Sequence, residues 1–366
     1  MIDTIVSVFV ISSIGAVLAM LLVFAERYIT NYGECEVKIN KEEGIQVQGG
    51  GSLLETLTQQ KIFIPSACGG RGSCGYCKVK VLDGAGPLLP TEEPYLSDEE
   101  RSDGIRLSCQ VKIRNDVRID IPEELLSIQE YECVCVDIQD LTYDIKQFRF
   151  ELKEPSRMNF VPGHYIQFFT PVYEGSEEEV YRAYSISSDP AEEGFIELVV
   201  RLVPNGICTT YMFDYLKVGD PVRINGPYGD FRLSDTNAPI VFVAGGSGMA
   251  PIKSMLHQMV NTDSERSATY FFGANTPGDL FFVEEMKALE GKLPNFRFVP
   301  VLAMPEAGNG WKGETGLVTE ALDRSLNTAG SYEAYLCGSP GMIDATVEVL
   351  KGHGMPLEHI FYDKFS

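Results

Sequence analysis

The hydrophobic positions of this chain change their period three times, and each pattern predicts a different kind of element. The first is a mostly apolar, charge-free run over residues 4–25. At about 1.5 Å per residue, a helix of this run would reach roughly 33 Å, enough to cross a bilayer core. A cleaved signal peptide would begin with basic residues, whereas none precedes Arg27. The run therefore predicts a single N-terminal transmembrane helix, within an anchor and linker spanning residues 1–33.

The rest of the chain has the patterns of globular domains. Residues 34–126 open with strand-like alternation at 36–40 and then become rich in glycine and cysteine. Residues 127–233 hold strand-like runs divided by turns, such as 148–152, which is typical of an antiparallel barrel. Residues 234–366 repeat the order buried strand, glycine turn, helix, which indicates a parallel sheet. We therefore predict a multidomain α+β and α/β chain.

Composition and charge limit the classes of binding partner and the cellular compartment that we expect for the chain. At 366 residues the chain exceeds one ordinary hydrophobic core, so two or three domains are expected. Its net charge of -22 and the lack of a basic stripe argue against nucleic acid. The acidity indicates a solvated surface, with docking to a basic partner as the alternative. Nine cysteines, four of them in a metal-type pattern, favour a reducing compartment, and Arg27 after the apolar run places the body in the cytoplasm.

The cysteine pattern predicts a metal centre. Cys68, Cys74 and Cys77 stand on a glycine-rich loop, and Cys109 follows at a distance. Four thiolates can surround a two-iron cluster, because thiolate is the ligand that iron in sulfide clusters favours. The loop glycines can adopt positive φ and turn backbone N–H groups toward cluster sulfurs. Structural zinc is the alternative, but it usually takes two short paired motifs, and no second one is present.

This spacing resembles the ligand set of plant- and adrenodoxin-type [2Fe-2S] ferredoxins over Glu34 to Leu126. The resemblance implies a β-grasp ferredoxin domain, with these four cysteines as its metal ligands. Cys133 and Cys135 alternate along a predicted strand and share one face, so we interpret them as packing residues.

A second resemblance covers the predicted barrel. Arg182 and Tyr184 alternate on a strand, so a cation for pyrophosphate and a ring for stacking face the same side. This run lies among glycine motifs at residues 163–166, 206–211 and 226–229, in the order of ferredoxin-NADP reductase-like flavoproteins. That family implies FAD, with Tyr184 against the isoalloxazine and Ser185 near its reactive nitrogen. The implied cofactor-binding residues here are Arg182, Tyr184, Ser185, Gly206, Thr209, Thr210 and Gly226.

The last segment predicts a Rossmann-like dinucleotide site. A buried strand at 240–244 leads into the turn of Gly245, Gly246 and Gly248 and then into a helix, the general device for holding pyrophosphate. Further strands end near 273–275 and 337–341, and we expect all three turns to line one crevice. No Lys or Arg lies between 273 and 285 to bind a 2′-phosphate, so we expect NADH.

The same family implies two roles in this segment. Its Cys-Gly-x-Pro motif matches Cys337, Gly338 and Pro340 and places Cys337 beside the nicotinamide, with a buried strand-end thiol as the alternative. An aromatic residue near the C-terminus covers the flavin in this family, which makes Phe365 the candidate, with tail packing as the alternative.

The order anchor, ferredoxin, FAD barrel and NADH domain resembles the family of NADH-oxidising subunits of sodium-translocating NADH:quinone reductases. This implies electron transfer from NADH to FAD, to the [2Fe-2S] cluster and to integral membrane electron-acceptor subunits. It also implies a single-pass protein of the bacterial inner membrane, with its domains in the cytoplasm. The loop at 172–180 is shorter than we expect for that family. Two alternatives stay open: the reductase component of an oxygenase system, and a carrier or anchoring module without reductase activity.

Overall fold

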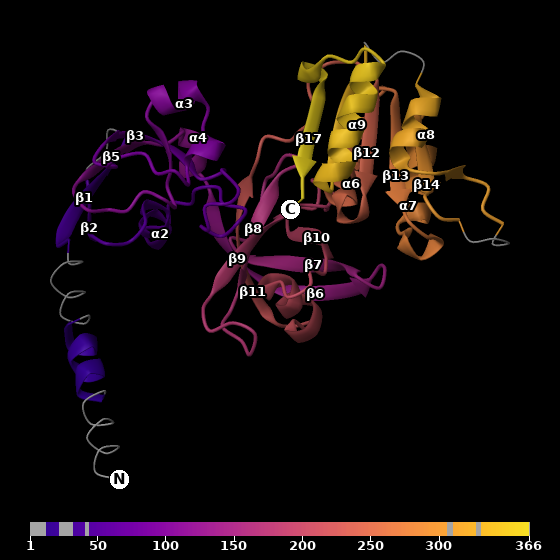
Figure 1. The fold of residues 1–366 in the computed structure, drawn as a ribbon. Helices are drawn as coiled ribbons and strands as arrows, with labels where there is room; N and C mark the ends of the chain where they lie inside the picture. Colours follow the sequence, from indigo (N-terminus) through magenta and orange to yellow (C-terminus); the bar gives the residue numbers. More distant parts are fainter. Residues whose placement is uncertain (1–11, 22–31, 41–43, 306–309, 327–330, 366) are drawn as a thin grey trace, which may run out of the picture. The chain divides into compact units, whose positions relative to one another are not determined.

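The computed structural model describes residues 12–21, 32–40, 44–305, 310–326 and 331–365 (Figure 1). The chain divides into two compact units, Met1–Ile128 and Gln129–Ser366. The domain limits expected from the sequence, 1–33, 34–126, 127–233 and 234–366, stay predictions. Each unit is described by itself below.

The predicted membrane span is described only in its middle. Residues 12–21 are helical, and side chains such as Ile14 and Leu18 are exposed. The remainder of the span, at 4–11 and 22–25, lies outside the described residues. Within the ranges given above, no helix combines the length and apolar character that crossing a bilayer requires. The prediction of a single N-terminal span therefore has no support from the described part of the chain.

The first unit is built on a five-stranded sheet with the order β2-β1-β5-β3-β4. Strands β1 and β5 run parallel, and the other neighbours are antiparallel. Alternate residues of β1, such as Val37 and Ile39, point into a core that helix α2 covers with Leu53 and Leu57. Ser52 begins that helix, because its hydroxyl accepts a hydrogen bond from Glu55 N. The elements of this unit are β1 Glu34–Ile39, β2 Ile45–Gln48, α2 Leu53–Gln59, β3 Lys78–Asp83, η1 Glu93–Tyr95, α3 Asp98–Ser102, β4 Ile105–Leu107, β5 Val117–Asp120 and α4 Glu123–Leu126.

The second unit begins with a six-stranded antiparallel sheet of order β10-β7-β6-β11-β8-β9. A bridge between Ile186 and Leu198 joins the two outer strands, so the sheet closes into the expected barrel. Cys133 and Cys135 are buried in its core beside Phe148 and Phe150, which confirms their packing role. The strands are β6 Gln129–Asp140, β7 Ile145–Glu154, β8 Tyr165–Thr170, β9 Val180–Ser185, β10 Phe195–Arg201 and β11 Pro221–Tyr228, and the short helices are α5 Ile207–Thr210 and η2 Tyr211–Tyr215.

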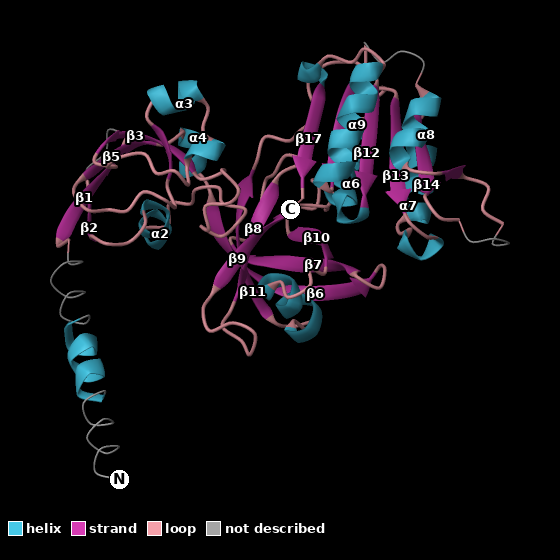
Figure 2. Ribbon diagram, viewed as in Figure 1, coloured by secondary structure: helices cyan, strands magenta, loops and turns pink. Residues whose placement is uncertain are grey.

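The unit ends in a six-stranded parallel sheet with the order β15-β14-β13-β12-β16-β17. Helices flank this sheet (Figure 2). Phe242 packs on the side of α6 and α7, and Val243 packs on the side of α8 and α9. The strands are β12 Ile240–Gly245, β13 Ala268–Ala274, β14 Phe296–Leu302, β15 Glu314–Thr315, β16 Glu333–Gly338 and β17 Ile360–Lys364. The other elements are η3 Gly246–Gly248, α6 Met249–Asn261, η4 Pro277–Asp279, α7 Val283–Lys292, α8 Val318–Ser325, α9 Pro340–Gly352 and η5 Leu357–His359.

The barrel and the parallel sheet share one core. Ile145 and Val199 of the barrel belong to the same buried cluster as Phe242 and Met255 of the parallel layer. The chain order places β13 on one side of β12 and β16 on the other. In sheets of this kind, ligands bind outside the carboxyl ends of the strands at such a switch point. The shared core packs the barrel against the same parallel layer.

Candidate functional site

The cysteine loop of the first unit has the backbone that its glycines predict. Four of them have positive φ, namely Gly69, Gly70, Gly72 and Gly75. A β-carbon at Gly72 would lie 2.6 Å from Gln110 Nε2, and one at Gly75 would lie 2.8 Å from Tyr95 Cδ1. The loop therefore needs glycine for its turn and for its close approach to neighbouring side chains.

The four thiols form two pairs. Cys77 Sγ lies 3.3 Å from Cys109 Sγ, and Cys68 is hydrogen-bonded to Cys74. The bond from Cys74 lowers the pKa of Cys68 to about 4, while the same contact raises that of Cys74. Likewise, the contact with Cys77 lowers the pKa of Cys109 to about 7 and raises that of Cys77. Each pair therefore favours one thiolate, the form that binds metal.

This pairing fits a two-iron cluster better than one zinc ion. A structural zinc ion would require its four ligands around a single point. Two separate thiol pairs instead offer one pair to each iron of a [2Fe-2S] cluster.

The predicted flavin residues lie on strand β9 of the barrel. Arg182 and Tyr184 are half-buried, and Ser185 is buried. Arg182 donates to the carbonyl of its neighbour Tyr181, and no carboxylate of the described residues forms an ion pair with it. Its guanidinium is therefore available to an anion such as pyrophosphate. Burial raises the pKa of the Tyr184 hydroxyl, so that group stays neutral and its ring can stack.

The glycine motif after β10 is a tight turn, which the hydroxyl group of Thr209 closes. Gly206 begins helix α5, and Thr209 Oγ1 bonds the backbone N and O of Val203. Thr209 therefore holds the turn, and Thr210 follows it, half-buried, at the end of α5. Gly226 lies in β11, where a β-carbon would come within 3.0 Å of Ile166 Cγ2.

The three turns expected to line one crevice lie together. Gly245 pairs with Gly273 across β12 and β13, and a β-carbon at Gly248 would lie 2.2 Å from Cys337 O. Gly338 has a φ of 142° and lies close to Gly245 O. Only glycine at 248 lets the first turn approach the end of β16 so closely. Pro340 then stands at the first position of α9, where its missing N–H is tolerated.

Cys337 meets two residues from other parts of the fold. It is fully buried, and burial raises its thiol pKa. Parallel pairing of β16 and β17 sets Asp363 beside Cys337. Ser185 Oγ donates to Asp363 Oδ2 at 3.4 Å, although the two residues are 178 positions apart. Burial raises the pKa of Asp363 to about 6. The structure thus brings a hydroxyl, a thiol and a carboxyl group to the junction of the barrel and the crevice.

Asp363 is not identified in the sequence analysis, because Phe365 is the only residue of the C-terminal segment considered there for a role at the site. Phe365 is half-buried, packs against the core beside α6, and donates its N–H to Gly338 O at 2.8 Å. A carboxylate two residues before that aromatic side chain was the available signal.

Arg201 is a second residue that sequence reasoning missed. A β-carbon at Gly246 would lie 3.0 Å from Arg201 Nη2, so the guanidinium lies over the glycine turn. Arg201 is half-exposed, and its Nε lies 3.1 Å from Asp144 Oδ2. The Nη groups of the guanidinium lie on the side of the turn, and a guanidinium beside a glycine turn is a suitable arrangement for binding an anion.

Three family models match consecutive parts of the chain. They are the 2Fe-2S iron-sulfur cluster binding domain over residues 37–114, the oxidoreductase FAD-binding domain over 132–233, and the oxidoreductase NAD-binding domain over 242–348. The matches follow the order that the motifs predict.

Known proteins resemble the chain over nearly its whole length. The F subunit of Na(+)-translocating NADH-quinone reductase of Neisseria meningitidis is 33% identical, with all of both chains covered. Its counterpart in Idiomarina loihiensis is 35% identical over 96% of each chain. Among solved structures, the cytochrome P450 reductase GcoB of Amycolatopsis is 28% identical, with a TM-score of 0.73 over 90% of this chain and 98% of that one. The ferredoxin reductase in carbazole 1,9a-dioxygenase is 25% identical, with a TM-score of 0.69 over 91% and 99%.

Proposed function

The chain belongs to the family of the F subunit of Na(+)-translocating NADH-quinone reductase, and from this we propose that it is the electron entry of such a membrane-bound reductase. It is an NADH oxidoreductase with FAD and a [2Fe-2S] cluster. The observation that carries the proposal is the 33% identity over the whole chain, together with the three cofactor domains in one order.

The cofactors supply the redox chemistry, because a flavin accepts two electrons as hydride and releases them singly to a cluster that takes one at a time. The protein supplies positions and charge. We assign Arg182 to the FAD pyrophosphate and Tyr184 to the isoalloxazine face. Ser185 and Cys337 border the place where flavin and nicotinamide meet. The contact between Ser185 and Asp363 supports this assignment, because it joins the barrel to the strand beside Cys337.

The nicotinamide dinucleotide would lie along the crevice of the parallel sheet. We assign its pyrophosphate to the turn of Gly245, Gly246 and Gly248, with Arg201 as a further cationic contact. Gly338 and Pro340 shape the adjoining turn, and Phe365 borders it. Asp363, with a pKa of about 6, keeps its charge at neutral pH and accepts the hydrogen bond from Ser185.

The four cysteines are assigned as cluster ligands in two pairs, Cys68 with Cys74 and Cys77 with Cys109. The decisive experiment adds NADH to the purified protein without oxygen and records both the flavin spectrum and the paramagnetic signal of the reduced cluster. In the wild type both should respond. Cys74→Ala should abolish the cluster signal and leave flavin bleaching intact. Loss of both responses would refute this division of labour.

The proposal extends to attachment at the membrane and to partner subunits there. The relatives are named as one subunit of a larger reductase, and we propose that integral membrane subunits accept the electrons on the way to quinone. Residues 4–25 would then be the single anchor in a bacterial inner membrane, with the domains in the cytoplasm. Fractionating cells that express the full chain or a chain lacking residues 1–31 tests this. An intact chain in the soluble fraction would refute the anchor.

The likeness to two oxygenase-associated reductases favours one second candidate, the reductase component of an oxygenase system. The same truncated chain separates the two functions. As part of a quinone reductase, it should lose electron transfer to membranes while retaining NADH-driven flavin bleaching. As an oxygenase reductase, it should reduce its partner as fast as the full chain does.

A further inference from the structure

Gln110 follows Cys109, the fourth cysteine assigned to the cluster, and both the oxygen and the nitrogen of its side-chain amide form hydrogen bonds. Thr91 Oγ1 donates to Gln110 Oε1 at 2.9 Å. Gln110 Nε2 donates to Cys109 Sγ at 3.6 Å, within the usual range for a hydrogen bond to sulfur. The side chain therefore connects a threonine of the 84–92 loop to a thiol assigned to the cluster.

The chemistry of the two partners defines the orientation of this amide. A metal-bound thiolate can only accept, so the amide must present its NH2 group to Cys109. The carbonyl end then faces Thr91, whose hydroxyl can donate. The opposite orientation would set a carbonyl oxygen against a negatively charged sulfur. Thr91 thus stabilises the orientation that serves the sulfur.

The ligand loop leaves a place for this amide. A β-carbon at Gly72 would lie 2.6 Å from Gln110 Nε2, and Gly72 has a φ of 73°. The amide therefore lies against the backbone of the loop that carries three of the cysteines. Any side chain at Gly72 would displace it.

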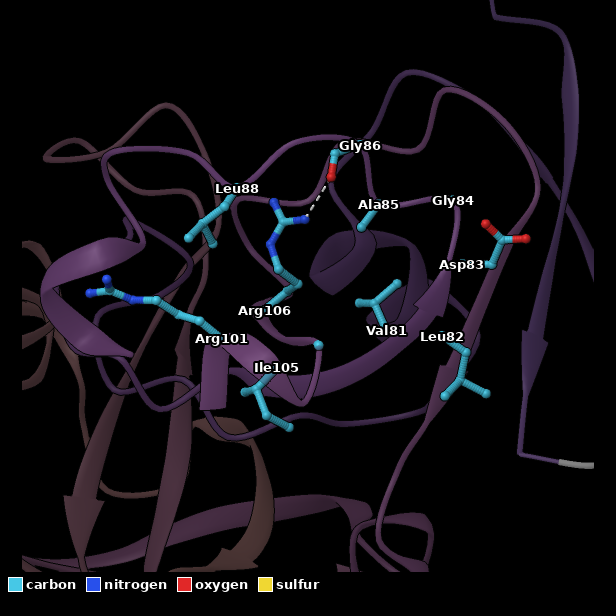
Figure 3. Close-up of a pocket in the computed structure, with 11 residues that line it drawn as sticks. Val81, Leu82, Asp83, Gly84, Ala85, Gly86, Leu88, Arg101, Ile105 and Arg106 are labelled. Carbon is cyan, nitrogen blue, oxygen red and sulfur yellow. Dashed lines mark hydrogen bonds between the residues drawn. The ribbon is translucent and has the colours of Figure 1, made fainter. Parts of the chain in front are cut away.

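A buried ion pair fixes the segment that holds Thr91. Its neighbour Glu92 is fully buried and accepts from Arg106 Nε at 2.9 Å and Nη2 at 2.6 Å, and from Leu107 N at 3.0 Å. Arg106 also donates to Gly86 O at 3.0 Å, as Figure 3 shows. These bonds tie the 84–92 loop to strand β4, which leads directly to Cys109. The Thr91 hydroxyl is thus held at a fixed place relative to the sulfur.

We propose that Gln110 and Thr91 are positioning residues that raise the reduction potential of the [2Fe-2S] cluster. This inference rests on the proposed function, which makes Cys109 a cluster ligand. Reduction adds one electron and no bond is made or broken, so the sulfurs become more negative. A donor aimed at one sulfur stabilises the reduced form more than the oxidised form.

The test is a potentiometric titration of the full-length, cofactor-loaded protein, with the paramagnetic signal of the reduced cluster as readout. Gln110→Leu should lower the ratio of reduced to oxidised cluster at a fixed potential about tenfold, which is a shift of about 59 mV for one electron. Thr91→Val removes the hydroxyl without touching the cluster and should lower the ratio about threefold.

Two controls separate tuning from general damage. Thr91→Ser keeps the hydroxyl and should retain the wild-type potential. Thr58→Val removes a hydroxyl that donates to the helix carbonyl of Leu54 and should also leave the potential unchanged. Equal potentials in wild type, Gln110→Leu and Thr91→Val would overturn the inference, as would a Thr91→Ser shift as large as that of Thr91→Val. If the Gln110→Leu protein fails to assemble a cluster, the reduction potential of Thr91→Val alone decides whether the inference holds. A wild type without any cluster signal would instead overturn the proposed function.

Discussion

Lys253 of helix α6 is a buried lysine that joins the parallel layer to the barrel. Its side chain is 5% exposed, and Nζ lies 3.0 Å from Glu197 Oε2 on β10 and 3.5 Å from Glu285 Oε1 on α7. It also donates to Ser187 O at 3.4 Å. We predict that Lys253→Met strongly destabilises the Gln129–Ser366 unit, because it leaves the buried carboxylate of Glu197 and the partly exposed carboxylate of Glu285 with one partner fewer.

The magnitude follows from what the two carboxylates retain. Removing one partner of a buried ion pair typically costs about 3–5 kcal/mol. Glu197 keeps its ion pair with Arg149, and Glu285 keeps the contact with His257 at 3.4 Å. The methionine side chain also fills the space that the aliphatic part of the lysine side chain occupied. We therefore expect the lower end of the range, about 3 kcal/mol.

Lys351→Met is the matched control. Lys351 Nζ lies only 2.8 Å from Glu348 Oε1, a shorter distance than either contact of Lys253, but the two side chains are 43% and 72% exposed. An exposed pair at this spacing on a helix contributes about 0.3–0.5 kcal/mol. If burial determines the energy of an ion pair, the longer but buried contacts of Lys253 should contribute more to stability than the shorter, exposed contact of Lys351.

The assay is thermal unfolding of the full FAD-loaded chain, followed by the fluorescence of released flavin. For a unit of this size, about 3 kcal/mol corresponds to a fall in Tm of roughly 6–12 °C, against about 1–2 °C for the control. Equal shifts for the two variants, or a shift of less than about 2 °C for Lys253→Met, would refute the reasoning.

The remaining predictions concern two carboxyl groups and one glycine. Burial raises the pKa of Asp363 from 3.8 to about 6, so the contribution of this carboxyl group to stability should fall as pH rises through this window, by up to about 3 kcal/mol. In unfolding curves recorded from pH 4 to 8, Asp363→Asn should therefore gain stability relative to the wild type as pH rises, and a difference that stays constant with pH would contradict this. Burial opposes ionisation of Glu333, but hydrogen bonds from hydroxyl groups and an arginine lower its pKa to about 2. Its contribution is therefore present above pH 4.5 and lost as the pH falls toward 2, so Glu333→Gln should cost up to about 3 kcal/mol at neutral pH and nothing near pH 2. Gly248→Ala would set a β-carbon 2.2 Å from Cys337 O, so titration should show NADH binding weakened at least tenfold. Gly352→Ala should bind NADH normally, because a β-carbon there would meet nothing within 4 Å apart from its chain neighbours and its own helix backbone.

The sequence alone determined the parts of this protein that depend on neighbouring residues. The spacing of Cys68, Cys74 and Cys77 and the glycines between them predicted a loop with positive φ, because that conformation is a local property of glycine. The run from 240 into Gly245 and Gly246 likewise predicted a strand, a turn and a helix, since a buried strand and a helix start each have a local signature. Alternating polarity predicted the barrel strands for the same reason.

Only the tertiary structure decided which distant groups meet. The pairing of β16 with β17 sets Asp363 beside Cys337, and the shared core of barrel and parallel layer brings Ser185 to the same place. The guanidinium of Arg201 above Gly246 and the contacts of Lys253 arise in the same way. Such contacts depend on strand order and register, which the chain acquires only when its hydrophobic faces are buried together. No local pattern of residues encodes them, because the partners are far apart in the chain.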